Sequence, residues 1–157
     1  MGARSYFFLD NQILSTDEVY GQQDIGRNDD QQLLADKSVL VIDDSPINLS
    51  VAEKTLSKFG AASLKAFSAK EGLQSFHQHH VDVILMDLHM PLIDGFEATS
   101  MIRATQKHRD NPIPILAYTT YSYDEVSKAI KKYQLYGYIG KPFTQTQVLE
   151  TILSVIS

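Results

Sequence analysis

The sequence contains no cysteine, which excludes disulfide bonds, a thiol nucleophile and a thiolate metal site. Basic residues are not in excess: the formal net charge is −5, so the chain lacks the basic face that neutralises the phosphates of a nucleic acid. No apolar run is long enough to cross a bilayer, and the short run SYFFL is poorly flanked for a signal peptide. We therefore expect a cytoplasmic chain with no nucleic-acid partner and no direct membrane contact.

What the chain does contain divides into three segments. Residues 37–157 alternate apolar runs with segments of helical spacing, and the apolar fraction of 43% is that of a globular protein. Residues 10–36 are rich in Asp, Asn and Gln without a sustained period, which is typical of a flexible polar linker. Residues 1–9 hold a short apolar run that fits a strand fragment. We expect one domain, preceded by a linker and a short appendage.

Five apolar runs in residues 37–157 predict five strands. They are Val39–Ile42, Ala61–Phe67, Val81–Met86, Ile113–Tyr118 and Tyr136–Ile139. Helix starts lie between them: Ser45 precedes a proline, while Ser68 and Ser122 each stand three residues before a glutamate, the spacing of a capping box. Five strands that alternate with five helices imply a parallel α/β sheet with helices on both faces.

Polar side chains follow four of these strands. Asp43 and Asp44 come directly after the first strand, Asp87 ends the third, Thr119 ends the fourth, and Lys141 follows the fifth. In a parallel α/β sheet the carboxyl ends of the strands share one edge, and ligands bind there. An acid after a strand is, taken alone, more often a loop residue or a helix cap. The joint placement of these groups on one edge predicts a functional site.

Three acids and one lysine at this edge leave an excess of negative charge. Two carboxylates about 5 Å apart repel each other by roughly 3 kcal/mol at an effective dielectric constant near 20. Because oxygen ligands favour Mg²⁺ or Ca²⁺, we expect a hard divalent cation between Asp43, Asp44 and Asp87. A cation, a lysine and a threonine around a carboxylate suit phosphoryl transfer, which depends on positioning and charge neutralisation. Asp87 can act as the nucleophile.

Four blocks of this sequence resemble the receiver domain of the two-component response-regulator family. They are VLVIDDSPIN, VILMDLHMPLIDGFEAT, PILAYTT and YIGKPF, in the family's order and at fitting separations over residues 37–157. The resemblance implies a flavodoxin-like, doubly wound, five-stranded parallel sheet of order 2-1-3-4-5 with five helices on two faces. It also implies a phosphoacceptor domain that assists its own phosphorylation and dephosphorylation.

By the same resemblance, the acids are expected to have separate roles. Asp87 is the phosphoacceptor, and Asp43 and Asp44 form the acidic pair that binds Mg²⁺ together with Asp87. The backbone carbonyl of His89 is a further metal ligand. The phosphoryl group would come from the phosphohistidine of a histidine kinase or of a histidine phosphotransfer protein.

The resemblance implies further that Thr119 is the switch hydroxyl, Tyr138 the switch aromatic and Lys141 the lysine that contacts the phosphoryl group. Phosphorylation would pull Thr119 inward, let Tyr138 rotate into a buried position, and change the face formed by the fourth helix, fifth strand and fifth helix, roughly residues 121–156. Two positions depart from the family pattern: Tyr118 stands where a smaller aliphatic residue is usual, and Thr120 where alanine is common. Both bear on how the loop closes on phosphate.

Other functions fit the residues less well. A haloacid-dehalogenase-type phosphatase, which also uses magnesium and a strand-end aspartate, needs a second acid at the position of His89. A flavodoxin-type nucleotide binder needs a Ser/Thr-rich phosphate loop where Asp43 and Asp44 stand. A degenerate receiver that serves only as an interaction module would lack one of the key side chains, and none is missing.

The larger context of the domain is left with two alternatives. Residues 1–9 resemble, weakly, the Gly-x-x-Ser-x-Phe-x-Phe closing strand of sensor-kinase ATP-binding domains. If this resemblance holds, the chain combines a kinase remnant, a linker and the C-terminal receiver of a hybrid histidine kinase, whose membrane anchor would lie elsewhere in the parent protein. The alternative is a free-standing single-domain response regulator. The oligomeric state stays open.

Overall fold

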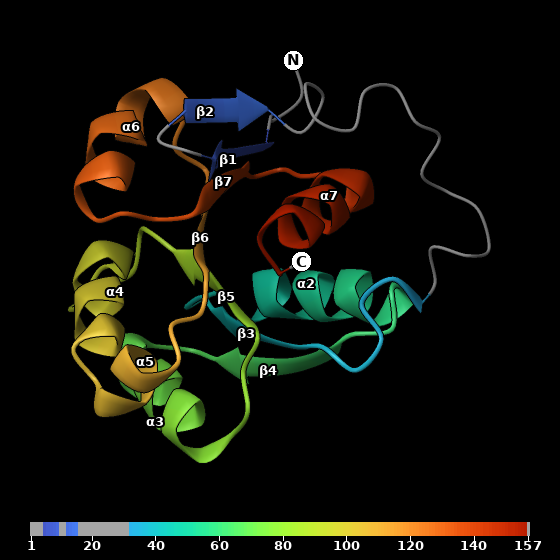
Figure 1. Cartoon of the computed structure of the whole chain (residues 1–157). Coiled ribbons are helices and arrows are strands. Elements are labelled where there is room, and N and C mark those ends of the chain that lie inside the picture. The colour runs from blue at the N-terminus through green and yellow to red at the C-terminus, as the bar shows by residue number, and fades with distance from the viewer. Residues whose placement is uncertain (1–4, 10–11, 16–31, 157) are drawn as a thin grey trace.

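A computed structural model describes residues 5–9, 12–15 and 32–156, which form a seven-stranded sheet of order β2-β1-β7-β6-β5-β3-β4 (Figure 1). The strands are β1 (Ser5–Leu9), β2 (Gln12–Ser15), β3 (Ser38–Ile42), β4 (Ala62–Ala66), β5 (Val83–Asp87), β6 (Ile115–Thr119) and β7 (Gly137–Gly140). Strands β3 to β7 are parallel and follow the order β4-β3-β5-β6-β7. This confirms the predicted doubly wound sheet of order 2-1-3-4-5.

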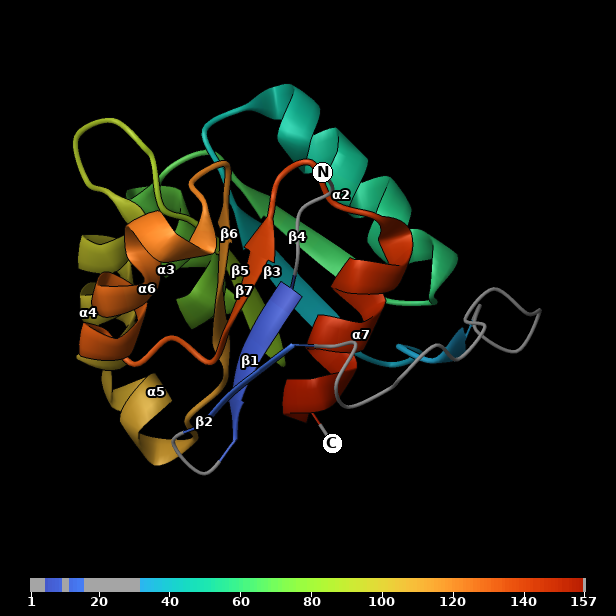
Figure 2. The same ribbon diagram turned by 90° about the horizontal axis from the view of Figure 1, so that it is seen from above.

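Helices cover both faces of the sheet (Figure 1). They are α2 (Pro46–Lys58), α3 (Ala69–Gln78), α4 (Gly95–Arg103), α5 (Gln106–Asp110), α6 (Tyr123–Lys132) and α7 (Gln145–Ile156). The views in Figures 1 and 2 place α2 and α7 on one face and α3 to α6 on the other. Two hydrophobic cores result, because successive residues of a strand point to opposite faces. Val41 and Leu85 pack under α2 and α7, whereas Ile42 and Met86 pack under the opposite layer.

The predicted helix starts are confirmed. The side chains of Ser45, Ser68 and Ser122 each accept a hydrogen bond from a backbone N–H in the first turn of the helix that follows. Each cap satisfies a donor that the helix itself leaves unpaired. Pro46 fills the first position of α2, where its missing N–H costs nothing. These caps set the residue at which each helix begins, and so set the length of the loop between each strand and the helix that follows it.

Six helices occur among the described residues, one more than the five expected. The segment after β5 forms two helices, α4 and α5. Thr105 has an extended backbone, donates its hydroxyl to the carbonyl of Ile102, and accepts the N–H of His108 with the same oxygen. A threonine hydroxyl competes in this way with the backbone ladder, which ends one helix and caps the next.

The N-terminal strands extend the sheet beyond the five parallel strands. β1 runs antiparallel to β7, with Tyr6 opposite Tyr138, and β2 runs antiparallel to β1 (Figure 2). The strand expected in residues 1–9 is therefore present, whereas β2 lies in the segment expected to be linker. Residues 10–11 and 16–31 of that segment lie outside the described residues. Within the described part of the chain, no helix has the length and apolar character needed to span a membrane.

Candidate functional site

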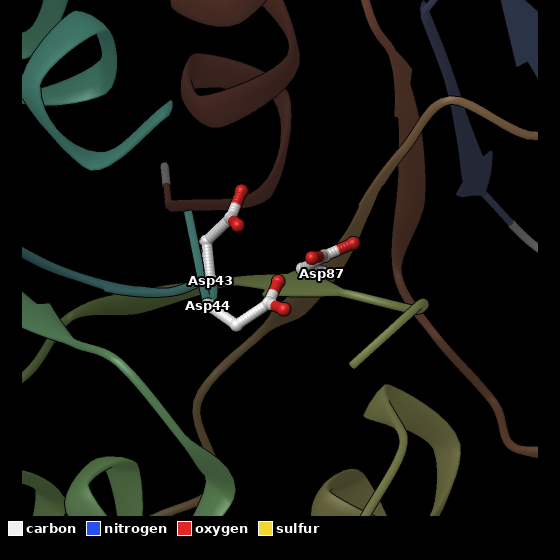
Figure 3. Close-up of side chains that lie close together, drawn as sticks. All are labelled: Asp43, Asp44 and Asp87. Carbon is white, nitrogen blue, oxygen red and sulfur yellow. The ribbon is translucent and has the colours of Figure 1, made fainter. Parts of the chain in front are cut away.

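Three carboxylates gather at the carboxyl edge of the parallel sheet (Figure 3). β3 and β5 are hydrogen-bonded neighbours with Ile42 opposite Met86, so the next residues, Asp43 and Asp87, emerge side by side. Asp44 follows Asp43 into the loop. Each of the three acids offers one oxygen, and these oxygens all lie within 4.8 Å of one another. The predicted convergence of acids from two separate strands is therefore present in the structure.

Asp43 is the most buried of the three acids, with no exposed surface. One of its oxygens accepts the N–H of Ser45 at 2.9 Å, and the other accepts the Nζ of Lys141 at 2.7 Å. A buried carboxylate without such partners would be strongly destabilising. Lys141 therefore compensates the charge of Asp43, while the exposed Asp44 relies on solvent or a cation.

Asp87 is almost fully buried. Its Oδ1 accepts the N–H of His89 at 3.1 Å and lies 3.7 Å from the Nζ of Lys141. Burial raises the pKa of the Asp87 carboxyl from an ordinary 3.8 to about 6, and the negative charge of Asp43 acts in the same direction. Lys141 and the His89 N–H oppose this pKa shift without cancelling it.

Thr119 and Lys141 reach the same edge from the next two strands. Tyr118 lies opposite Asp87 in the β5–β6 register, so Thr119 follows immediately beyond it. Thr119 is fully buried, and its hydroxyl oxygen accepts the N–H of Tyr121 at 3.1 Å. The backbone N–H of Lys141 donates to the carbonyl of Thr119 at 2.7 Å, which joins the loops after β6 and β7.

Tyr138 is buried in this structure. Its Oη donates to the backbone carbonyl of Tyr121 at 2.6 Å, and its ring meets the ring of Tyr123 edge to face at 5.6 Å. The expected switch aromatic thus occupies the buried position that we expect in the switched state. Tyr121 connects Tyr138 with Thr119. Its backbone N–H donates to the Thr119 hydroxyl oxygen, and its backbone carbonyl accepts the Tyr138 hydroxyl.

Three contacts at the site were not predicted from the sequence. The Oη of Tyr121 lies 2.9 Å from the Nδ1 of the exposed His89, which places a side-chain bridge between the loops after β5 and β6. A Cβ on Gly95 would overlap the backbone carbonyl oxygen of Asp87, so only glycine lets α4 approach so closely. The ring of Tyr118 lies 4.1 Å from the Nζ of Lys141. Of these residues, Gly95 carries a local signal, as a glycine that opens a helix, and Tyr118 stands out from the sequence only as a departure from the family pattern.

The model of the response regulator receiver domain family matches residues 39–153 of this chain. The chain belongs to this family. A probable histidine kinase 4 from rice is 34% identical to this receiver over 139 residues, which are 76% of this chain and 14% of that protein. The response regulator DivK of Brucella ovis is 28% identical over 76% of this chain and 96% of its own length. This receiver therefore spans only a small part of the plant kinase and nearly all of DivK.

Solved receiver structures share the fold. The receiver domain of a sensor histidine kinase from Pseudomonas aeruginosa, solved with a magnesium ion coordinated in its active-site cleft, has a TM-score of 0.70 and 27% identity. The match covers 78% of this receiver and 98% of that chain. The three acids and Lys141 of this receiver sum to two negative charges, and their oxygen donors suit a hard divalent cation. The residues present therefore fit a magnesium ion.

Proposed function

We propose that this receiver domain accepts a phosphoryl group on Asp87 from the phosphohistidine of a histidine kinase or a histidine phosphotransfer protein. The observation that supports this most strongly is the setting of Asp87: a buried carboxyl 3.7 Å from the Lys141 ammonium and within 4.8 Å of two further acids. An oxygen of the deprotonated carboxylate attacks phosphorus as the P–N bond to the donor imidazole breaks. The imidazole nitrogen keeps the electron pair of that bond.

The remaining site residues then stabilise the transferred charge. Asp43, Asp44 and Asp87, with the carbonyl of His89, would hold Mg²⁺, which neutralises phosphoryl oxygens when it is bound. The Lys141 ammonium, already between Asp43 and Asp87, needs only a small movement to bind a phosphoryl oxygen. The Thr119 hydroxyl oxygen accepts the Tyr121 N–H, so its proton is not used in that bond. The Thr119 hydroxyl can therefore donate this proton to a second phosphoryl oxygen.

The same contacts support a switch. A phosphoryl group that binds Thr119 also fixes the backbone of Tyr121, whose carbonyl holds Tyr138 in its buried position. Phosphorylation would therefore shift the population toward buried Tyr138 and change the partner affinity of the surface formed by α6, β7 and α7. The contacts of the buried state are already formed in this structure.

Label transfer from radioactive acetyl phosphate tests the proposal. The unmodified chain should take up label with Mg²⁺ and lose this ability with a chelator. Asp87→Asn should take up none. Asp94→Asn is the matched control, since Asp94 is an exposed helix cap on the following loop and asparagine caps equally well. Label on Asp87→Asn at the rate of the unmodified chain would contradict the assignment.

We also propose that the chain is part of a hybrid histidine kinase that works in the cytoplasm, with residues 1–9 from its ATP-binding domain, 10–36 as linker and 37–157 as receiver. The 34% identity to a plant histidine kinase supports this. The similarity to DivK, which this chain covers almost completely, keeps a free-standing regulator as the alternative. The genomic sequence upstream of Met1 distinguishes them: an in-frame kinase region supports the hybrid, and a stop codon directly upstream contradicts it.

A further inference from the structure

Lys141 has three neighbours that attract its ammonium group. The Nζ lies 2.7 Å from Asp43, 3.7 Å from Asp87 and 4.1 Å from the centroid of the Tyr118 ring. Two of these neighbours are among the three acids of the site. The third is the aromatic ring of Tyr118, at a position that departs from the family pattern. A ring within about 6 Å of an ammonium attracts it, and more strongly when both are shielded from water.

Both partners of this contact are shielded. Tyr118 is 1% exposed and the Lys141 side chain 10%. Burial and the negative charges of Asp43 and Asp87 raise the pKa of the Tyr118 hydroxyl far above its ordinary value. The hydroxyl therefore stays neutral, and the ring acts on the ammonium through its π face.

Tyr118 also supports the backbone that carries the lysine. Its ring packs against Phe143, with centroids 5.5 Å apart and planes tilted by 49°. Lys141 and Phe143 flank Pro142 in the loop after β7, so a single side chain on β6 contacts this loop at two points. Tyr118 is itself held by the core under α2 and α7.

Without the Tyr118 ring, the Lys141 side chain could adopt several positions near the two acids. This side chain is long and flexible, and its closest partner here is Asp43, not the proposed acceptor Asp87. We propose that Tyr118 is a positioning residue: its ring face holds the Lys141 ammonium beside Asp87, where it can bind the transferred phosphoryl group. This role rests on the proposed function of Asp87. It means that the Tyr118 side chain positions Lys141 in addition to packing in the core.

Substitutions at residue 118 separate the ring face from simple packing. Tyr118→Phe keeps the ring and should take up label from acetyl phosphate within about twofold of the unmodified rate. Tyr118→Leu removes the π face and should be about tenfold slower, as expected for a shielded cation–π contact. Tyr136→Leu, at an exposed tyrosine before β7, is the matched control and should leave the rate unchanged.

A series of fluorinated phenylalanines at residue 118 holds shape nearly constant while it weakens the negative ring face. The transfer rate should fall stepwise with fluorination. It should do so only while Lys141 is present: in a Lys141→Met background, Tyr118→Leu should cause no further loss. The proposal would be overturned if the transfer rate did not change with fluorination. It would also be overturned if Tyr118→Leu slowed transfer in the Lys141→Met background by the same factor as in the unmodified chain. Either result would mean that Tyr118 contributes only packing.

NMR of the unmodified chain tests the placement without any phosphoryl donor. The Cε protons of Lys141 should show the upfield shift of a group above a ring face, and this shift should survive in Tyr118→Phe and vanish in Tyr118→Leu. Absence of the shift in the unmodified chain would overturn the proposal even if the leucine variant fails to fold. If the unmodified chain takes up no label, the function of Asp87 is refuted. If it takes up label and Tyr118→Leu does so equally fast, only the role of Tyr118 is refuted.

Discussion

Replacing the proposed phosphoacceptor should make the protein more stable. Asp87 is 5% exposed, and burial raises its pKa from 3.8 to about 6. Its charged form is therefore less favourable in the folded chain than in the unfolded one. A pKa difference of about two units corresponds to roughly 3 kcal/mol. Because Asp44 beside it is exposed and admits solvent, we expect about 1–2 kcal/mol of this to be recovered in Asp87→Asn at pH 7 without divalent cations.

The pH dependence has a definite sign. The unfolded chain releases the Asp87 proton near pH 3.8 and the folded chain near pH 6, so between these values the folded chain binds more protons. The stability of the unmodified protein relative to Asp87→Asn should therefore fall as pH rises from about 4 to about 6, and stay low above pH 6. Below pH 4 the advantage of the asparagine variant should disappear.

Urea denaturation from pH 4 to 8, in a chelator, measures this difference. A gain of 1–2 kcal/mol corresponds to a melting temperature about 3–6 °C higher for a chain of this size. Saturating Mg²⁺ should stabilise the unmodified chain more than the variant, because binding to the folded state alone adds stability. A variant less stable than the parent at pH 7 in chelator, or a difference that does not change with pH, would refute the electrostatic account of the site.

Three further substitutions probe the neighbouring groups. Lys141→Met should lower the free energy of unfolding by about 3 kcal/mol in urea at pH 7, because it leaves the fully buried Asp43 without its cation; a loss below 1 kcal/mol would contradict that pairing. Gly95→Ala should cost about 1–3 kcal/mol in thermal unfolding and slow label uptake, since its Cβ would displace the backbone of Asp87; unchanged melting and uptake would show that the loop yields freely. Asp44→Asn should weaken Mg²⁺ binding at least tenfold by calorimetry, while stability without metal changes by less than 1 kcal/mol because the side chain is exposed; equal affinity would exclude Asp44 as a ligand.

The strand ends explain why so much of the site could be predicted. Asp43, Asp87 and Thr119 each follow an apolar run directly, and Lys141 follows one after a single glycine. Parallel strands bring their carboxyl ends to one edge of the sheet, whatever the conformation of the loops. Helix starts were equally predictable where a serine cap and a glutamate stand at fixed spacing, as at Ser122. These features depend on local sequence and on one general rule of topology.

The features that were missed have no clear signal in the local sequence. The break at Thr105 contains neither glycine nor proline, and shows only in how its hydroxyl is shared between two helices. The pairing of β1 with β7 joins residues at opposite ends of the chain, and no local pattern encodes it. The contact of Tyr118 with Lys141 depends on side-chain positions across two loops. Tyr118 was noted as unusual from the sequence, but its partner was visible only in the structure.

The account depends most of all on a divalent cation at the carboxyl edge beside Asp87. Anomalous diffraction from crystals containing Mn²⁺, which accepts the same oxygen ligands as Mg²⁺, tests this directly. We predict one strong peak in contact with carboxylate oxygens of Asp44 and Asp87, and its loss in crystals of Asp44→Asn. A peak elsewhere, with none between these acids, would contradict the account.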